Sequence, residues 1–129
     1  MRVETKLRVA RPTDHLEEVV RFYTDGLGLS RLDSFENHQG FDGVMVGVPG
    51  AICHLEFTRK RGHEAGPAPT EDNLLVFYLP DPAARVQRMR AHGFHPVPAH
   101  NPWWTAHGET FEDADGYRVV LAGESSFIR

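Results

Sequence analysis

The sequence predicts an α+β fold in which one β-α-β-β-β module occurs twice in tandem. Two observations support this prediction. An amphipathic helix that ends at a glycine occurs twice along the chain, and apolar residues around each helix follow the two-residue period of strands. Asp14 matches Asp81 and Gly28 matches Gly93, so the two copies lie 65 to 67 residues apart, with small insertions.

The first helix is predicted between Asp14 and Tyr23. Its apolar residues have the i, i+3, i+4, i+7 spacing that gives a helix one buried stripe, and they are Leu16, Val19, Val20, Tyr23 and Leu27. Asp14 followed by Glu17 resembles a capping box, in which two side chains satisfy N–H groups at the start of a helix. Gly26 and Gly28 are predicted to end the helix, because glycine readily adopts the left-handed conformation that closes helices.

A second helix is predicted between Asp81 and Arg90. Asp81 is a suitable N-cap residue, and Pro82 follows at the first helical position, where a missing N–H group costs nothing. Gly93 is predicted to end this helix as Gly28 ends the first.

Strands are predicted on both sides of each helix. In the first module they are Leu7–Ala10, Arg31–Phe35, Phe41–Val48 and Ala51–Phe57. In the second module they are Leu74–Leu79, His95–Pro98, Glu109–Glu112 and Tyr117–Ala122. The segments between strands are rich in turn residues, such as Asn37-His38-Gln39-Gly40 and Asp113-Ala114-Asp115-Gly116.

The boundary between the modules is predicted from composition. Residues 59–72 begin with Arg59-Lys60-Arg61, contain several prolines and glycines, and show no apolar periodicity, which is typical of an exposed linker. We therefore predict a single domain with a first module at residues 1–58, a linker at 59–72 and a second module at 73–129.

The size of the chain predicts that it folds without covalent or metal cross-links. A chain of 129 residues buries about two thirds of its unfolded surface, so it needs neither a disulfide nor a structural metal. Cys53 is the single cysteine and lies within an apolar strand. We predict that it is a reduced, buried, structural thiol, because a reactive cysteine needs an accessible, electropositive setting.

Charge and hydropathy exclude several classes of partner. The formal net charge is −4, and Arg59-Lys60-Arg61 is the one basic cluster. Nucleic acids and membrane surfaces attract proteins with extended positive surface, so neither is a predicted partner. The sequence shows no secretory signal and no apolar run of membrane length, which predicts a cytoplasmic protein.

Three motifs, taken together, resemble a known superfamily. They are Phe22-Tyr23 with Leu27-Gly28-Leu29, the helix that ends in His92-Gly93, and Phe111-Glu112-Asp113-Ala114-Asp115-Gly116 before a closing strand. In this order, on two β-α-β-β-β copies, they are similar to the vicinal oxygen chelate superfamily of glyoxalases, bleomycin-resistance proteins and extradiol dioxygenases. The resemblance implies a curved, mostly antiparallel sheet around a concave pocket, with the helices on the outside. It implies no single reaction, because one fold hosts many chemistries.

In metal-dependent members of the superfamily, four side chains, two from each module, bind one divalent ion. Aligned by its helices, this chain has Arg8 at the first ligand position, Glu56 at the second, Leu74 or Asn73 at the third, and Val120 at the fourth. Arginine offers only N–H donors, and leucine and valine have no lone pair, so with Leu74 at the third position three of the four positions cannot bind a cation. We predict that the metal site of the family is absent.

The strand around Glu56 nevertheless places polar groups where the resemblance puts the substrate pocket. Residues two apart on a strand share a face, so His54 and Glu56 point one way, while Cys53, Leu55 and Phe57 point to the helix. A neighbouring strand is expected to add Arg8. Three interpretations stay open: a merely solvated face, an Arg8–Glu56 ion pair in place of the metal, or a site where Arg8 holds an anion and His54 moves a proton.

A second candidate binding segment is Asn101-Pro102-Trp103-Trp104-Thr105-Ala106-His107-Gly108, predicted as a loop that holds both tryptophans. Trp103, Trp104 and His107 are candidate ligand contacts, because large aromatic side chains supply apolar and stacking surface to pockets. The alternative is that one or both tryptophans close the core or an oligomer interface.

Two classes of function follow. The first is a metal-free protein of the bleomycin-resistance kind that binds a small organic molecule in the concave pocket, with no cofactor. The second is a small lyase, isomerase or dioxygenase. Such an enzyme is either metal-free, with His54 and Glu56 as acid and base, or dependent on one divalent metal ion held by a rearranged set such as His54, Glu56 and His107. We rank binding first because three of the four ligand positions are lost.

We also predict a homodimer, because open sheets leave exposed edges and apolar faces that a second copy of the chain can cover. Sedimentation at micromolar to millimolar protein should show a species of twice the mass of the 14.5 kDa chain. A monomer across this whole concentration range would contradict the prediction.

Overall fold

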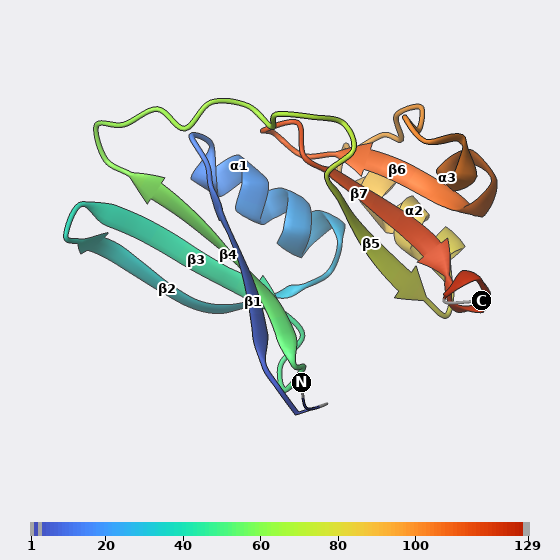
Figure 1. Ribbon diagram of the computed structural model, residues 1–129, viewed down its shortest axis with the longest axis horizontal. Coiled ribbons are helices and arrows are strands. Elements are labelled where there is room, and N and C mark those ends of the chain that lie inside the picture. Colours follow the sequence, from blue (N-terminus) through green and yellow to red (C-terminus); the bar gives the residue numbers. More distant parts are fainter. Residues whose placement is uncertain (1, 3, 128–129) are drawn as a thin grey trace. The chain divides into compact units, whose positions relative to one another are not determined.

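The computed structural model describes residues 2 and 4–127, and the chain forms two compact units at residues 1–66 and 67–129 (Figure 1). The first unit contains β1 (Leu7–Pro12), α1 (Leu16–Arg21), the π-helical turn η1 (Phe22–Gly26), β2 (Ser30–His38), β3 (Phe41–Gly47) and β4 (Cys53–Lys60). The second contains β5 (Leu74–Leu79), α2 (Pro82–Ala91), α3 (Pro102–His107), β6 (Gly108–Glu112), β7 (Arg118–Gly123) and the 3₁₀ turn η2 (Glu124–Ser126). In the described part of the chain, no helix is long and apolar enough to cross a membrane.

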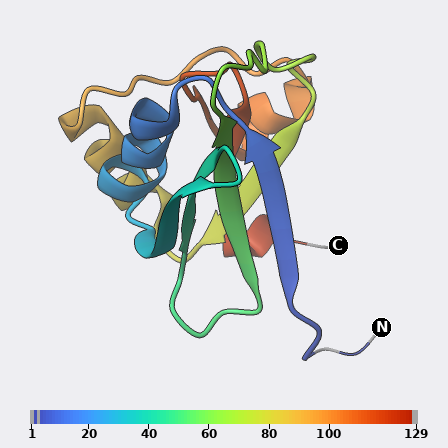
Figure 2. The same cartoon turned by 90° about the vertical axis from the view of Figure 1, so that its left-hand side faces the viewer.

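The first unit is a four-stranded mixed sheet in the order β1-β4-β3-β2. β1 and β4 are parallel, and the other two pairs are antiparallel. Figure 2 shows β1 and β4 side by side along their length. A tight turn cannot join parallel strands, so a crossover must link them, and α1 with η1 begins that connection. The β-α-β-β-β order predicted for this module is confirmed.

The core of the first unit lies between the helical segment and one face of the sheet. Its buried apolar side chains are Val19, Val20, Phe22, Tyr23 and Leu27 from the helical segment, and Val44, Val46, Leu55 and Phe57 from β3 and β4. The rings of Tyr23 and Phe57 pack with their centroids 4.8 Å apart. Gly28 follows with a φ of 83° and ends the helical segment in the left-handed conformation, as predicted.

The second unit repeats this topology with one strand fewer. Its sheet has the order β5-β7-β6, with β5 and β7 parallel and β6 antiparallel to β7. The strand predicted at His95–Pro98 does not form, and only Val97 makes an isolated bridge, to Thr110. Pro96 and Pro98 explain the difference, because a proline has no N–H group to donate to a ladder of hydrogen bonds.

One of the two predicted helix starts is confirmed and the other is wrong. Asp81 caps α2 by accepting the backbone N–H of Ala84 at 3.2 Å, with a proline in the first turn. Asp14 does not cap α1. Its two carboxylate oxygens instead accept the backbone N–H groups of Ala65 and Gly66, at 2.7 and 2.8 Å. These two hydrogen bonds lower the pKa of Asp14 and hold the end of the first unit beside the start of α1.

The predicted burial of Cys53 is also wrong. Leu55 and Phe57 of the same strand face are buried, as predicted, whereas Cys53 is exposed. Cys53 is the first residue of β4 and pairs with the exposed Leu7 at the end of the sheet. The strand alternation gave its face correctly, but burial also requires a helix above that point, and strand periodicity does not report where the helix ends.

The segment around the tryptophans is a short helix, α3, and not the predicted loop. Asn101 caps it by accepting the N–H of Trp103 at 3.0 Å, and Pro102 occupies the first turn. This is the same Asx-Pro pattern that predicted the start of α2. It was overlooked here because a helix of six residues contains too few apolar residues to show a period.

Replacing Phe57 with alanine should lower the free energy of unfolding by about 3–5 kcal/mol, because it leaves a cavity against Tyr23. The matched control is C53A, on the same strand and the same face, which should change the free energy by about 0.5 kcal/mol or less because Cys53 is exposed. Urea unfolding followed by circular dichroism measures both. Equal losses in the two variants would contradict the core described above.

Candidate functional site

In the first unit, Arg8 contacts both His54 and Glu56, the neighbourhood that the resemblance to the superfamily implied. Arg8 Nε donates to His54 Nε2 at 2.9 Å, and Arg8 Nη1 lies 3.5 Å from Glu56 Oε2. The Arg8 side chain is 48% exposed, whereas that of Glu56 is 14% exposed. His54 accepts through Nε2, so its ring proton is on Nδ1.

Strand register produces this arrangement. Arg8 is the register partner of His54 across the parallel β1–β4 pair, although 46 positions separate them in the chain. His54 and Glu56 share a face of β4 because they are two residues apart. Met45 of β3 is directly opposite Glu56 of β4, so the two side chains lie on the same face. The Met45 side chain is half-buried.

Two glycines of β3 let neighbouring side chains lie directly on the backbone of this face. A Cβ atom at Gly43 would lie 2.3 Å from Cζ of Phe35, so the phenyl ring covers the bare backbone there. A Cβ atom at Gly47 would lie 2.9 Å from Cβ of His54 and 3.3 Å from Cδ1 of Leu32. We use the name Arg8 face for the surface formed by Arg8, Leu32, Phe35, Met45, His54 and Glu56.

The residues of the Arg8 face do not fit a divalent metal ion. Arg8 has no lone pair to give a cation, and it is hydrogen-bonded to His54 and ion-paired with Glu56, the two side chains that could donate one. Within either unit, no three described His, Cys, Asp or Glu side chains gather in one cluster. A divalent site normally needs three or more protein ligands. His107, the third member of the alternative set, lies in the second unit and stacks there on Trp103.

Leu74 and Val120, which the resemblance aligned with the third and fourth metal-ligand positions (with Asn73 as the alternative at the third), lie beside a small cavity in the second unit. Leu74 and Val120 line a space of about 10 Å³ together with Trp104 and Thr110. The side chain of Thr110 is 3% exposed, and its hydroxyl has no hydrogen-bond partner in the structure. The space is about the size of one water molecule, which suits the unpaired hydroxyl. Neither aliphatic side chain can donate to a metal.

Trp103 and His107 form a separate pair on α3. Their rings stack with centroids 3.8 Å apart and an interplanar angle of 13°. Trp103 is 47% exposed, whereas Trp104 is half-buried in the cavity beside Val120. The two tryptophans therefore have different surroundings, and the part that each takes in ligand binding stays a prediction.

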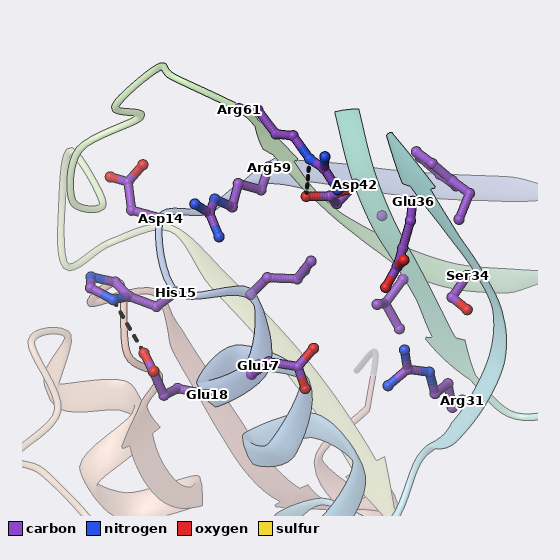
Figure 3. A pocket seen from close by; sticks show the side chains of 14 residues that line it. Asp14, His15, Glu17, Glu18, Arg31, Ser34, Glu36, Asp42, Arg59 and Arg61 are labelled. Atoms are coloured by element: carbon purple, nitrogen blue, oxygen red, sulfur yellow. Dashed lines mark hydrogen bonds and ion pairs between the residues drawn. The ribbon is translucent and has the colours of Figure 1, made fainter. Parts of the chain in front are cut away.

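A third feature, which was missed in the sequence, is a charged cavity of about 260 Å³ between α1 and the strands of the first unit (Figure 3). Figure 3 shows the Arg59 side chain extending into it, with Asp14 on one side and Asp42 on the other. Arg61 donates to Asp42 through Nε and Nη2, at distances between 2.9 and 3.2 Å, and lowers the pKa of that carboxyl.

This cavity lies on the side of the sheet opposite the Arg8 face, because Arg59 and Phe57 share a face of β4. Its lining mixes acidic residues with Arg31, Arg59 and Arg61, so charges of both signs compensate each other there. The sequence prediction placed Arg59 in the linker. β4 in fact continues to Lys60, and the pairing of Asp42 with Arg59 shows that β3 holds this segment in the sheet.

Family models match both parts of this chain. The YycE-like N-terminal domain matches residues 7–58, and the YycE-like C-terminal domain matches residues 72–123. The uncharacterized protein YycE of Bacillus subtilis (strain 168) is 46% identical over 119 residues, which cover 90% of this chain and 86% of that protein.

Solved structures show the same fold. A crystal structure of a YycE protein of unknown function from Bacillus subtilis has a TM-score of 0.86 and 44% identity, covering 97% of this chain and 93% of that one. The trypanothione-dependent glyoxalase I of Leishmania major has a TM-score of 0.74 at 20% identity, covering 93% and 86%. TnmS3, an antibiotic binding protein from Streptomyces sp. CB03234, has a TM-score of 0.67 at 20% identity, covering 95% and 98%.

We predict that the purified protein carries no stoichiometric Zn, Ni, Mn or Fe, and that chelators leave its melting temperature unchanged. Replacing Glu56 with glutamine should then act only by removing the charge partner of Arg8, with a loss of roughly 0–1 kcal/mol in the free energy of unfolding. Elemental analysis and thermal melts with and without EDTA measure this. About one metal per chain, with a melting temperature that falls on chelation and recovers when the ion returns, would contradict the prediction.

Proposed function

This chain belongs to the YycE-like family of the vicinal oxygen chelate superfamily, and on that premise we propose that it binds a small organic anion without a metal ion. The binding surface is the Arg8 face of the first unit. The observation that carries the proposal is the half-exposed Arg8 side chain, whose guanidinium contacts His54 and Glu56. The resemblance to the superfamily implies that Arg8 stands at a position that holds a metal ligand in metal-dependent members.

The chemistry of Arg8 favours an anionic group on the ligand. A guanidinium has five N–H donors in a planar fork, and here one is bonded to His54 and another lies near Glu56. The remaining donors are on a side chain that is 48% exposed, and they suit a carboxylate, phosphonate or phosphate group. Glu56 fixes the orientation of the fork, so less side-chain freedom is lost when the ligand binds.

The rest of the Arg8 face suits the organic part of such a ligand. Met45 and Phe35 are half-buried and Leu32 is 38% exposed, so apolar surface lies beside the charged group. Small-molecule sites commonly combine an apolar lining with a few fixed polar groups. TnmS3, which has this fold, is by its description an antibiotic binding protein.

We favour binding over acid–base catalysis by His54 and Glu56. The Nε2 lone pair of His54, which a general base would use, already accepts from Arg8. Nδ1–H can only donate in that tautomer. A lyase or isomerase would therefore need Arg8 to leave His54 when the substrate binds, and no described contact favours such a movement.

We also propose that the protein works as a homodimer in the cytoplasm. Its single cysteine has no partner for an internal disulfide, and an unpaired exposed thiol suits a reducing compartment. The outer edges of β1 and β2 in the first unit are unpaired within that unit's sheet, and a second chain could cover them.

The binding proposal can be tested with pairs of small probes that differ only in charge. Benzoate with benzamide, and phenylphosphonate with its diethyl ester, are titrated into isotope-labelled protein while backbone amide resonances are followed. We expect the anions to shift resonances of β1 and β4, and R8M to weaken their binding about tenfold or more, the cost of a charge-assisted hydrogen-bonded pair. The uncharged probes should be insensitive to this substitution.

The matched control is R31M, which removes the same charge from the opposite side of the same sheet. It should leave anion binding within about twofold of the original value. Anion binding that survives R8M, or that R31M weakens equally, would overturn the proposal.

A further inference from the structure

The second unit contains an open cavity of about 510 Å³ that belongs to neither the Arg8 face nor the positions of the family's metal ligands. Residues of α2, the end of α3, β6 and β7 line it. Figure 1 shows where these elements lie in the second unit. Its apolar lining residues are Pro82, Ala83, Val86, Ala106 and Leu121. The volume lies within the range of about 300–1,000 Å³ that is usual for small-molecule sites.

Strand register places this cavity on the side of the sheet that faces α2. Leu121 and Glu109 are paired across β7 and β6 and both line the cavity. Val120 and Thr110, the adjacent pair, line the small cavity beside Trp104 instead. Because successive strand residues point to opposite faces, the two cavities lie on opposite sides of the second sheet.

His107 adds to this cavity an imidazole ring held in place by two contacts on α3. Its Nδ1 lies 2.8 Å from the backbone oxygen of Trp103. A carbonyl oxygen can only accept, so Nδ1 carries the ring proton and Nε2 of the neutral ring keeps its lone pair. Stacking on Trp103 at 3.8 Å limits rotation of the ring. His107 lines the cavity beside its apolar residues, together with the polar Gln87, Thr105 and Glu109.

A close backbone contact holds His107 at this place. Gly108 follows it, and a Cβ atom there would lie 2.7 Å from both the backbone oxygen of Leu121 and Cγ1 of Val120. Only glycine lets the end of α3 lie so near β7. At its other end the helix is fixed by Asn101, which accepts the N–H of Trp103.

We propose that this cavity, which we call the His107 cavity, binds a small neutral molecule with an apolar body and one N–H or O–H donor. The body lies against Val86 and Leu121, and the donor hydrogen-bonds to Nε2 of His107. This ligand differs in charge and in location from the organic anion of the Arg8 face, so the two sites can be tested independently.

Indole and 1-methylindole are suitable probes, because they differ in one N–H group and little else. Each is titrated into isotope-labelled protein, and the shifts of backbone amides and of the His107 ring give the site and the dissociation constant. We expect indole to bind about fivefold more tightly than 1-methylindole, the contribution of one ordinary hydrogen bond. The shifted resonances should belong to α2, the end of α3 and β6.

Two variants separate the parts of the proposal. H107F keeps a ring against Trp103 but has no acceptor, so the fivefold preference should fall to about one while 1-methylindole still binds. A83L fills the cavity from α2, and both probes should bind at least about tenfold more weakly. A83L leaves α3 unchanged, so it tests the cavity even if H107F disturbs that helix.

Two controls complete the design. H95F makes the same chemical change at an exposed histidine outside the cavity, and E109M removes a carboxylate acceptor from the lining. Both variants should keep the preference for indole. A preference that survives H107F, or that disappears in E109M, would overturn the proposal. Shifts outside the second unit, or binding unaffected by A83L, would also overturn it.

Discussion

The parallel pairing of the first and last strands is the constraint on which each unit depends. β1 pairs with β4 and β5 pairs with β7, so strands that are distant in the chain become neighbours. Such a pair requires a long connection, and the helix and remaining strands of each unit form it. In the first unit the same pairing brings Arg8 beside His54, so the constraint that joins the first strand to the last also assembles the candidate site.

Much of this architecture follows from the sequence, because it rests on periodicity and on local chemistry. The alternation of β4 gave the faces of His54, Glu56, Leu55 and Phe57 correctly, and Asp81 marked the start of α2. Arg8 was placed with His54 and Glu56 only through the resemblance to a known superfamily. A single sequence contains no local pattern that indicates which distant strands pair, or in which register.

The errors have a common physical origin in contacts between distant segments. Asp14 has the chemistry of a helix cap, but two N–H groups from residues 65 and 66 compete for its carboxylate. Cys53 has the correct face but lies at the end of the sheet. The failed strand at His95–Pro98 is different, since its prolines were visible and the loss of N–H donors could have been anticipated.

The position of Cys53 has a consequence for handling the protein. Leu7 donates its backbone N–H to Ile52 at 2.7 Å and pairs with Cys53, and the side chains of Leu7 and Ile52 are both exposed. The single thiol of the chain thus lies beside apolar surface that favours association between molecules. In aerated buffer a covalent link between two chains can form only through this thiol, so reducing agent or a serine at position 53 separates reversible self-association from an oxidation product.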